Sequence, residues 1–218
     1  MLNQNHIAMK TKQRIISGMV IMLLLIAGTG CRQSMTEKSL NYGDNLKNAI
    51  SDYEHSRQKF SQEVNESISS TNKKLEKEDP KLSEVAHDWE KRWDEVHKSF
   101  NRLQENFSEV GKSSQKYFEK LQELSSGIEN DSLRRAELSK NRRLKEKWTN
   151  AYEEASKNFD KIRKVLKEGN DYQRVLVASS VRQKIEKNIA ELDKISIKAN
   201  KILKELKTFT IEGKKLIA

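Results

Sequence analysis

Residues 82–128 read LSEVAHDWEKRWDEVHKSFNRLQENFSEVGKSSQKYFEKLQELSSGI. Apolar side chains recur in this stretch at intervals of three and four residues, a spacing that places them on one face of an α-helix. Alternation kept up over about six heptads is typical of a long helix that buries a narrow seam against other helices. The stretch therefore predicts one long helix at the centre of an all-α protein.

Three breaks separate this helix from similar periodicities on either side. Proline lacks an amide proton and restricts the residue before it, so Asp79-Pro80 is expected to end one helix and to cap the next. Asp131 or Ser132 can cap a helix after the second break. Gly169 is typical of a helix C-terminus and marks the third break.

Four long helices follow from these breaks, the first of them capped by Asp44. Connections of a few residues favour antiparallel neighbours. We therefore predict an elongated antiparallel helical bundle or coiled coil over residues 44–218. The expected helices cover about residues 44–77, 80–125, 132–167 and 171–216.

The composition agrees with such a fold. Charged residues make up 34% of the chain, apolar residues 35% and aromatic residues only 6%. These values are low for a thick globular core. They suit long helices that bury one stripe and expose the remaining surface to water.

The N-terminal residues have the layout of a secretory signal peptide. A basic stretch that contains Lys10, Lys12 and Arg14 precedes an apolar run over residues 15–27. That run is too short to span a hydrocarbon core of about 30 Å. We therefore predict a signal peptide over residues 1–30, for which Met9 is an alternative start.

Cys31, the only cysteine, follows the small residues Gly28-Thr29-Gly30. This ending resembles a bacterial lipobox, in which the cysteine thiol receives a diacylglyceryl group before cleavage. We predict that acylated Cys31 anchors the chain in a membrane, facing the periplasm, with a short tether over residues 31–43. An uncleaved anchor and an ordinary secreted protein are the alternatives. Arg32, where aspartate would favour inner-membrane retention, resembles outer-membrane sorting in a host with two membranes.

The net charge of +10 would ordinarily indicate a nucleic-acid partner. Export changes that inference, because the polyanions outside the cytoplasm are lipid headgroups, peptidoglycan carboxylates and wall polymers. We therefore expect no nucleic acid. The expected partners are the membrane, anionic envelope polymers or another envelope protein, and a second copy of the chain.

Part of the sequence is similar to a proteobacterial lipoprotein family. The similar residues are Tyr117-Phe118, the turn from Asn130 to Arg135, and the helix that ends in Lys164-Val165-Leu166. Members of that family couple a lipobox to a long helical hairpin with a Leu-Arg-Arg turn. The family is known only as a domain of unknown function, so the resemblance implies a fold and a location but no activity. Residues 169–173 depart from the apolar, asparagine-rich pattern of the family.

Motifs for catalysis or metal binding are incomplete. Gly111-Lys112-Ser113 lacks the earlier glycine and the preceding strand of a phosphate-binding loop. The pairs Glu84/His87 and Asp94/His97 would lie about 15 Å apart on one helix, too far to close on one metal pair. No nucleophile elbow is present in the sequence. We predict a noncatalytic protein without a cofactor or a metal.

Two basic stretches, residues 134–147 and 194–215, stand out from the charged background. One interpretation is a solvated helix face. The other is contact with an anionic envelope surface, which would weaken as salt screens the charges. The candidate contact residues are Arg134, Arg135, Lys140, Arg142, Arg143, Lys194, Lys198, Lys201 and Lys204.

The three tryptophans, Trp89, Trp93 and Trp148, fall in the apolar register. This position predicts that they anchor the core, and a stacking platform for a ligand is the alternative.

These features predict a noncatalytic bacterial envelope lipoprotein that acts as a membrane-anchored scaffold, adaptor or spacer. One alternative is a salt-sensitive binder of peptidoglycan or anionic envelope polymers through the basic helix faces. A second alternative is a self-assembling coiled coil, in which residues 82–128 pair between chains.

Overall fold

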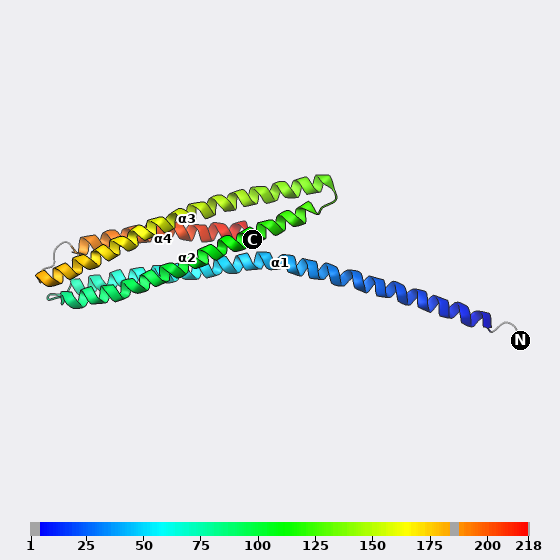
Figure 1. The fold of residues 1–218 in the computed structure, drawn as a ribbon, viewed down its shortest axis with the longest axis horizontal. Helices are drawn as coiled ribbons and strands as arrows, with labels where there is room; N and C mark the ends of the chain where they lie inside the picture. The colour runs from blue at the N-terminus through cyan, green and yellow to red at the C-terminus, as the bar shows by residue number, and fades with distance from the viewer. Residues whose placement is uncertain (1–4, 184–187, 218) are drawn as a thin grey trace. The chain divides into compact units, whose positions relative to one another are not determined.

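The computed structural model describes the backbone of residues 5–183 and 188–217 and the side chains of residues 39–183 and 189–217 (Figure 1). Its helices are α1 (Asn5–Leu75), α2 (Leu82–Ser126), α3 (Asp131–Arg182) and α4 (Asn188–Leu216). No strand occurs in these ranges, so the predicted all-α helical bundle is confirmed. The chain divides into two compact units, residues 1–44 and 45–218.

The predicted signal peptide and Cys31 lie outside the residues whose side chains are described. α1 is helical on both sides of Asp44, so the helix start expected there is not observed. Gly43 is the weakest helix former beside Asp44. A single glycine costs only about 1 kcal/mol relative to alanine, which a long helix tolerates.

The second unit packs its helices antiparallel along their length. Tyr53 and Phe60 of α1 lie against Phe107 and Phe100 of α2, so the two helices run in opposite directions. The same reversal relates α2 to α3 and α3 to α4. It is seen in the pairs Phe107–Tyr152, Phe100–Phe159, Trp148–Phe209 and Lys161–Glu205.

The first two breaks lie close to their expected positions. α1 ends at Leu75, and α2 begins at Leu82, two residues beyond the proline. Asp88 of α2 joins the two helices, because it accepts from Ser70 and Arg92 and pairs with Lys74 at 3.0 Å.

The second break is capped one residue earlier than expected. The Asn130 side chain, rather than that of Asp131 or Ser132, accepts a hydrogen bond from the Leu133 amide at 3.1 Å. Asparagine is among the preferred residues at a helix N-cap, and its side-chain oxygen satisfies an otherwise unpaired amide of the first turn.

The third break was predicted at Gly169, and this prediction is wrong. α3 continues through Gly169 to Arg182, so residues 171–182 belong to this helix and not to α4. The helix ends at Gln183, which takes a left-handed conformation with a φ of 52°. Such a conformation is uncommon for a residue with a Cβ, and neither glycine nor proline marks the end in the sequence.

Gly169 lies inside α3 at a position where Trp93 leaves no room for a side chain. An added Cβ would stand 2.0 Å from Cε2 of Trp93. Trp89 donates from Nε1 to the Gly169 carbonyl at 3.0 Å, and Trp93 donates to the Leu166 carbonyl at 3.2 Å. The two indole rings stack at 4.6 Å, and Tyr172 packs edge-on against Trp89. We call Trp89, Trp93, Gly169 and Tyr172 the tryptophan base.

A buried polar group joins α1 to α4 in the middle of the unit. Arg57 donates to both carboxylate oxygens of Glu54, at 2.8 and 2.7 Å, and to the Leu203 carbonyl at 3.5 Å. Thr210 also donates to Glu54, at 2.8 Å. Burial opposes ionisation of Glu54, but hydrogen bonds from Arg57, Thr210 and Gln58 outweigh it and lower the pKa of Glu54 to about 2.

Candidate functional site

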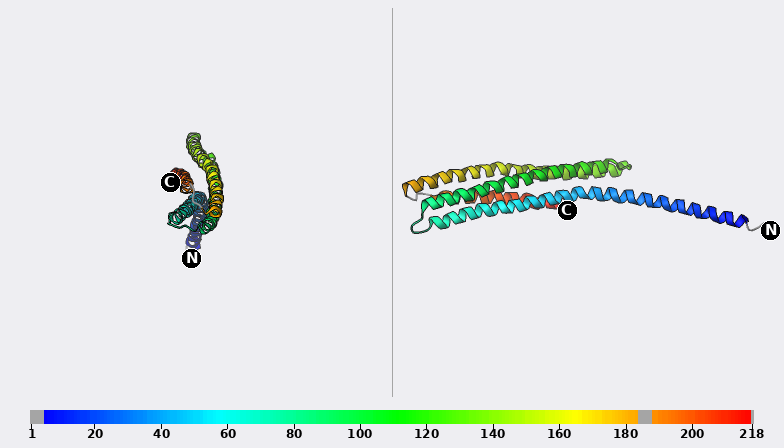
Figure 2. Two further views of the ribbon diagram at one scale, coloured as in Figure 1. Left: turned by 90° about the vertical axis from the view of Figure 1, so that its left-hand side faces the viewer. Right: turned by 60° about the horizontal axis from the view of Figure 1, so that its bottom comes forward.

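The hairpin formed by α2 and α3 extends beyond the C-terminal end of α4 (Figures 1 and 2). Phe118 is the last buried apolar residue of α2, and Trp148 is the first of α3. The Trp148 ring packs against Phe118 and against Phe209 of α4, so it marks the boundary of the packed core. We call residues 119–147 the α2–α3 tip.

Polar contacts hold the α2–α3 tip together. Asn141 donates from Nδ2 to the Leu121 carbonyl at 3.2 Å and to Oγ of Ser125 at 2.7 Å. The apolar side chains of the tip, among them Leu121 and Leu124, are only half-buried, and Leu133 is 60% exposed. The tip therefore joins two helices through a polar seam, without the dry core of the remaining bundle.

Arg134 has a structural role in the turn of the tip. Its guanidinium donates to the Ile128 carbonyl at 2.8 Å and to the Glu129 carbonyl at 3.3 Å, and it also pairs with Asp131. These contacts satisfy carbonyl groups beyond the end of α2. Arg134 was expected to contact an anionic surface, but the structure engages it within the chain.

A groove of about 780 Å³ lies between α2 and α3 at the tip. Arg135, Arg142 and Lys145 line it from α3, and Glu119 lines it from α2. The residues on α3 are seven and three positions apart, which places them on one face of the helix. Apolar surface comes from Phe118 and Leu138, and further polar groups come from Gln122, Ser139 and Asn141.

The charged groups of the groove are not neutralised by one another. Among the residues whose side chains are described, Arg135, Arg142, Lys145 and Glu119 take part in no ion pair. Glu119 only accepts a hydrogen bond from Gln115, at 2.8 Å. The groove therefore presents three cations and one carboxylate to a ligand.

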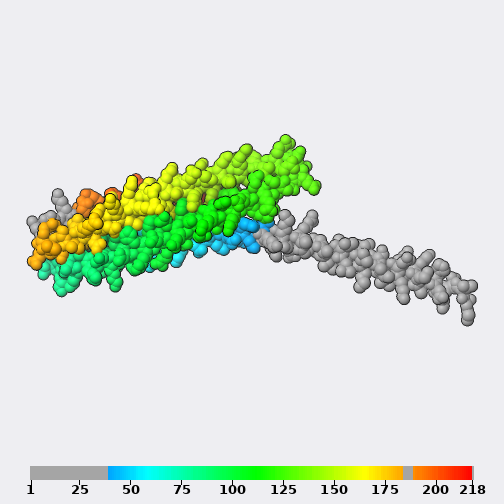
Figure 3. All heavy atoms as spheres, in the orientation of Figure 1, coloured from blue at the N-terminus to red at the C-terminus, as the bar shows by residue number. Residues whose placement is uncertain are grey.

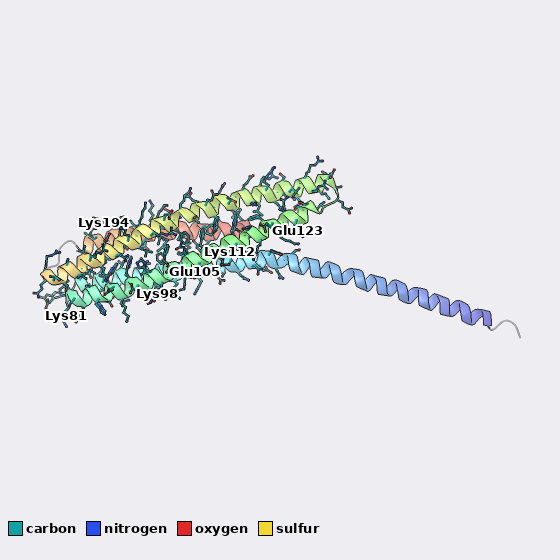
Figure 4. The ribbon with its side chains drawn as sticks, viewed as in Figure 1. Lys81, Lys98, Glu105, Lys112, Glu123 and Lys194 are labelled. Atoms are coloured by element: carbon teal, nitrogen blue, oxygen red, sulfur yellow. The ribbon has the colours of Figure 1, made fainter. Side chains whose placement is uncertain are left out.

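Most other surface charges of the hairpin form pairs within one helix. Lys81, Lys98 and Lys112 each pair with a glutamate three residues away on α2, and Glu123 pairs with Lys120 (Figure 4). Lys140 pairs with Glu137 on α3. Exposed pairs of this kind contribute little stability, but they lower the charge available to a partner.

The second basic stretch contributes an ion pair to the packing of α4 against α3. Lys194 pairs with Glu191 at 2.7 Å, and Lys198 crosses to Glu168 of α3 at 2.5 Å. Lys201 lines a smaller groove of about 320 Å³ between α3 and α4, and Lys204 is exposed. The stripe expected from the sequence is thus partly used to join the two helices.

Of the residues expected at a contact surface, the structure brings Arg135 and Arg142 together and leaves Arg143 outside the groove. Sequence reasoning missed Glu119 and Gln122, and it placed Lys145 in the basic stretch without singling it out. Figure 3 shows α2 and α3 side by side on one face of the unit. Only this pairing reveals that Glu119 lines the same groove as the α3 cations, because no local sequence signal fixes the register of the hairpin.

The remaining candidate residues have structural environments. Trp89, Trp93 and Trp148 are at most 3% exposed, which confirms that they anchor the core. His87 is exposed and lies 3.7 Å from Glu90, and His97 hydrogen-bonds to Asn170 at 3.0 Å. In the described part of the chain, no cluster of three or more histidine, cysteine or acidic residues could hold a metal ion.

Comparisons with known proteins found no matching family model, no matching curated protein and no matching solved structure. The similarity to a lipoprotein family therefore stays a prediction. Among the residues that the structure describes, no helix has the length and apolar character needed to cross a membrane.

Proposed function

We propose that this protein is a noncatalytic envelope lipoprotein that acts as a membrane-anchored helical adaptor or scaffold. The observation that carries the proposal is the position of Cys31, directly after a basic segment, a short apolar run and three small residues. An acyl chain contributes about 0.8 kcal/mol per buried methylene, and stable anchoring needs more than one chain. Acylated Cys31 would therefore hold the helical unit at a membrane.

The packing of the helical unit supports an adaptor role. The core runs from the tryptophan base to Trp148 and contains contacts between aromatic rings along this length, so this part offers a stiff support. The α2–α3 tip, in contrast, has half-buried apolar residues and a groove whose charged side chains form no ion pair with any described residue. This division suits a protein that presents one end of a long hairpin to another envelope component.

Metabolic labelling with an alkyne palmitate analogue tests the proposal. Wild-type chain is expected to incorporate the label and to fractionate with membranes, and Cys31→Ser is expected to lose both properties. Cys31→Ala provides a second variant without a thiol or a hydroxyl. Wild-type chain that stays unlabelled would overturn the lipoprotein assignment.

A second candidate function is binding of an anionic envelope polymer, and the unpaired cations of the groove favour it. Sedimentation with purified sacculi at low and high salt tests this function. Binding that salt reverses would support it, since exposed charges are screened over about 10 Å at 0.1 M ionic strength.

Self-assembly through residues 82–128 stays a further prediction. From Leu82 to Phe118, the apolar seam of α2 is buried within the chain. Pairing between chains would therefore use the tip or other surface residues. Analytical ultracentrifugation of the detergent-solubilised chain measures this property, and a monomer at high concentration would count against it.

A further inference from the structure

We propose that the groove of the α2–α3 tip binds a carboxylate-rich wall peptide that carries a free amine, as the stem peptides of peptidoglycan do. The proposal rests on the envelope location proposed above, because only an exported chain meets such a polymer. It assigns the contact to Arg135, Arg142, Lys145 and Glu119 rather than to the basic stretches as a whole.

The spacing of the cations suits an extended ligand with several anionic groups. On α3, Arg135 and Arg142 are separated by about 10.5 Å along the helix axis, and Arg142 and Lys145 by about 4.5 Å. The three positions span about 15 Å of the helix axis, which is more than one small anion covers. A peptide with carboxylates on successive residues spans this distance, and arginine can pair with each carboxylate through two parallel hydrogen bonds.

Glu119 decides between classes of anionic ligand. A carboxylate in the same groove as three cations repels a ligand that carries only negative charge, such as a phosphate polymer or an anionic lipid surface. The same carboxylate attracts an ammonium group. Carboxylates together with an amine therefore match the groove better than phosphates do, and such a combination occurs in wall peptides that contain a diamino acid.

The neutral lining of the groove also suits a peptide. Gln122 and Ser139 can exchange hydrogen bonds with amide groups, which both donate and accept, and the side-chain oxygen of Asn141 can accept one. Phe118 and Leu138 provide a small apolar surface for a methyl side chain such as that of alanine. A volume of about 780 Å³ falls within the usual range for ligand sites.

Sedimentation of the full-length chain, solubilised in a nonionic detergent, with purified sacculi tests the proposal. The triple variant Arg135→Gln/Arg142→Gln/Lys145→Gln removes the cations of the groove. Its affinity for sacculi is expected to fall by at least about tenfold, since each charge-assisted hydrogen bond contributes to binding.

The matched control is Lys116→Gln/Arg143→Gln/Lys147→Gln. It removes the same charge from the same end of the hairpin, but none of its residues lines the groove. Its affinity is expected to change by less than about threefold. Equal losses in the two triple variants would mean diffuse attraction between charges and would overturn the proposal. Circular dichroism verifies that both variants keep their helices.

Chemical modification of the sacculi tests the role of each ligand group. Amidation of the carboxylates is expected to abolish binding, and acetylation of the amines is expected to weaken it about threefold. Glu119→Gln should weaken binding to native sacculi by the same factor and should be insensitive to acetylation. Additive losses from acetylation and Glu119→Gln would show that Glu119 does not contact the amine.

Two further arms separate the other anionic partners. Hydrofluoric acid strips phosphate polymers from sacculi, and the treated material is expected to bind as before. Vesicles of phosphatidylglycerol and phosphatidylcholine are expected not to bind through the groove. Loss of binding after stripping, or vesicle binding that the groove triple variant abolishes, would overturn the proposal.

Palmitate labelling is measured in parallel on the same samples. A labelled chain that ignores sacculi would refute the groove assignment and leave the lipoprotein proposal standing. An unlabelled chain that binds sacculi through the groove would refute the lipoprotein proposal and leave the groove assignment standing.

Discussion

The two ends of the α2–α3 hairpin differ in how their helices meet. At the tryptophan base, two indole rings fill the interface, and their Nε1 atoms donate to α3 carbonyls at 3.0 and 3.2 Å. At the α2–α3 tip, Asn141 makes the contact between helices through polar atoms. One hairpin thus combines a closed, specific interface with an open and polar one.

A seven-residue series along α3 explains the change. Every seventh position toward the tip is first a buried apolar residue, namely Ile162, Ala155 and Trp148. The next two positions of the series are polar, namely Asn141 and Arg134. The helical register is kept while the chemistry of the seam changes from apolar to polar. The comparison teaches that a helix can continue beyond the residue at which its core packing ends. The part of the helix without core packing is then available for contacts with other molecules.

The largest difference is expected when an aromatic anchor is removed. Trp89→Ala leaves a large cavity in the tryptophan base and should lower the free energy of unfolding by about 4 kcal/mol. Leu124→Ala at the tip removes a half-buried side chain and should cost less than about 1 kcal/mol. Urea unfolding followed by circular dichroism at 222 nm measures both. Similar losses would mean that the tip is packed as well as the base.

A methyl group added to a glycine tests the difference in packing between the base and the tip by adding volume instead of removing it. Gly169→Ala places a Cβ 2.0 Å from the Trp93 ring and should destabilise the protein by about 3 kcal/mol. Gly127→Ala is the control, because its Cβ would meet nothing closer than 3.7 Å and its φ is −77°. Its unfolding midpoint should stay the same or rise slightly. Tolerance of alanine at Gly169 would contradict the packing of the base.

Acid is expected to weaken the packed region and to leave the tip unchanged. The pKa of Glu54 is lowered to about 2 in the folded protein, so the unfolded chain binds a proton first as the pH falls below about 4.5. Its stabilising effect is present above that pH and is lost toward pH 2. Glu54→Gln should cost about 2 kcal/mol at pH 7, less than the full shift implies because the carboxylate keeps some contact with water.

Urea unfolding of the wild type and of Glu54→Gln across pH 2–7 measures this effect. The two stability curves should converge at the acid end. A difference that is independent of pH would show that the Glu54 carboxylate is not held ionised by Arg57 and Thr210.

A smaller loss than from Trp89→Ala, Gly169→Ala or Glu54→Gln is expected from Asn141→Ala in the tip. This substitution removes the hydrogen bonds to Leu121 and Ser125 and should cost about 1 kcal/mol. Amide hydrogen exchange measures it locally, with faster exchange in residues 119–147 and no change around Gly169. Faster exchange around the base as well, or an unchanged tip, would argue against a polar seam that opens on its own.

Much of the fold could be predicted from the sequence because its signals are local. The three–four spacing of apolar residues predicts α2, and Pro80 predicts the break before it. Each signal lies within or next to the element that it predicts, and the structure contains both the helix and the break. Gly169 could not be interpreted in this way. A glycine that ends a helix and one that makes room for a distant indole look the same in the sequence, and only the position of Trp93 distinguishes them.

The candidate site was predictable in part. The excess of basic residues after position 133 identifies the correct helix, and Arg135 and Arg142 were among the expected residues. Whether each charge is compensated depends on partners from other helices. Lys198 meets Glu168, which is 30 residues away, and Glu119 reaches the groove from across the hairpin.

The close approach at Gly169 also constrains how this sequence can change during evolution. Any larger residue at position 169 collides with the indole of Trp93, so a replacement there first requires a smaller residue at position 93. The two positions are 76 residues apart in the sequence, yet a substitution at position 169 requires a substitution at position 93. Covariation between them in related sequences would identify chains that share this helical pairing even where little else is similar.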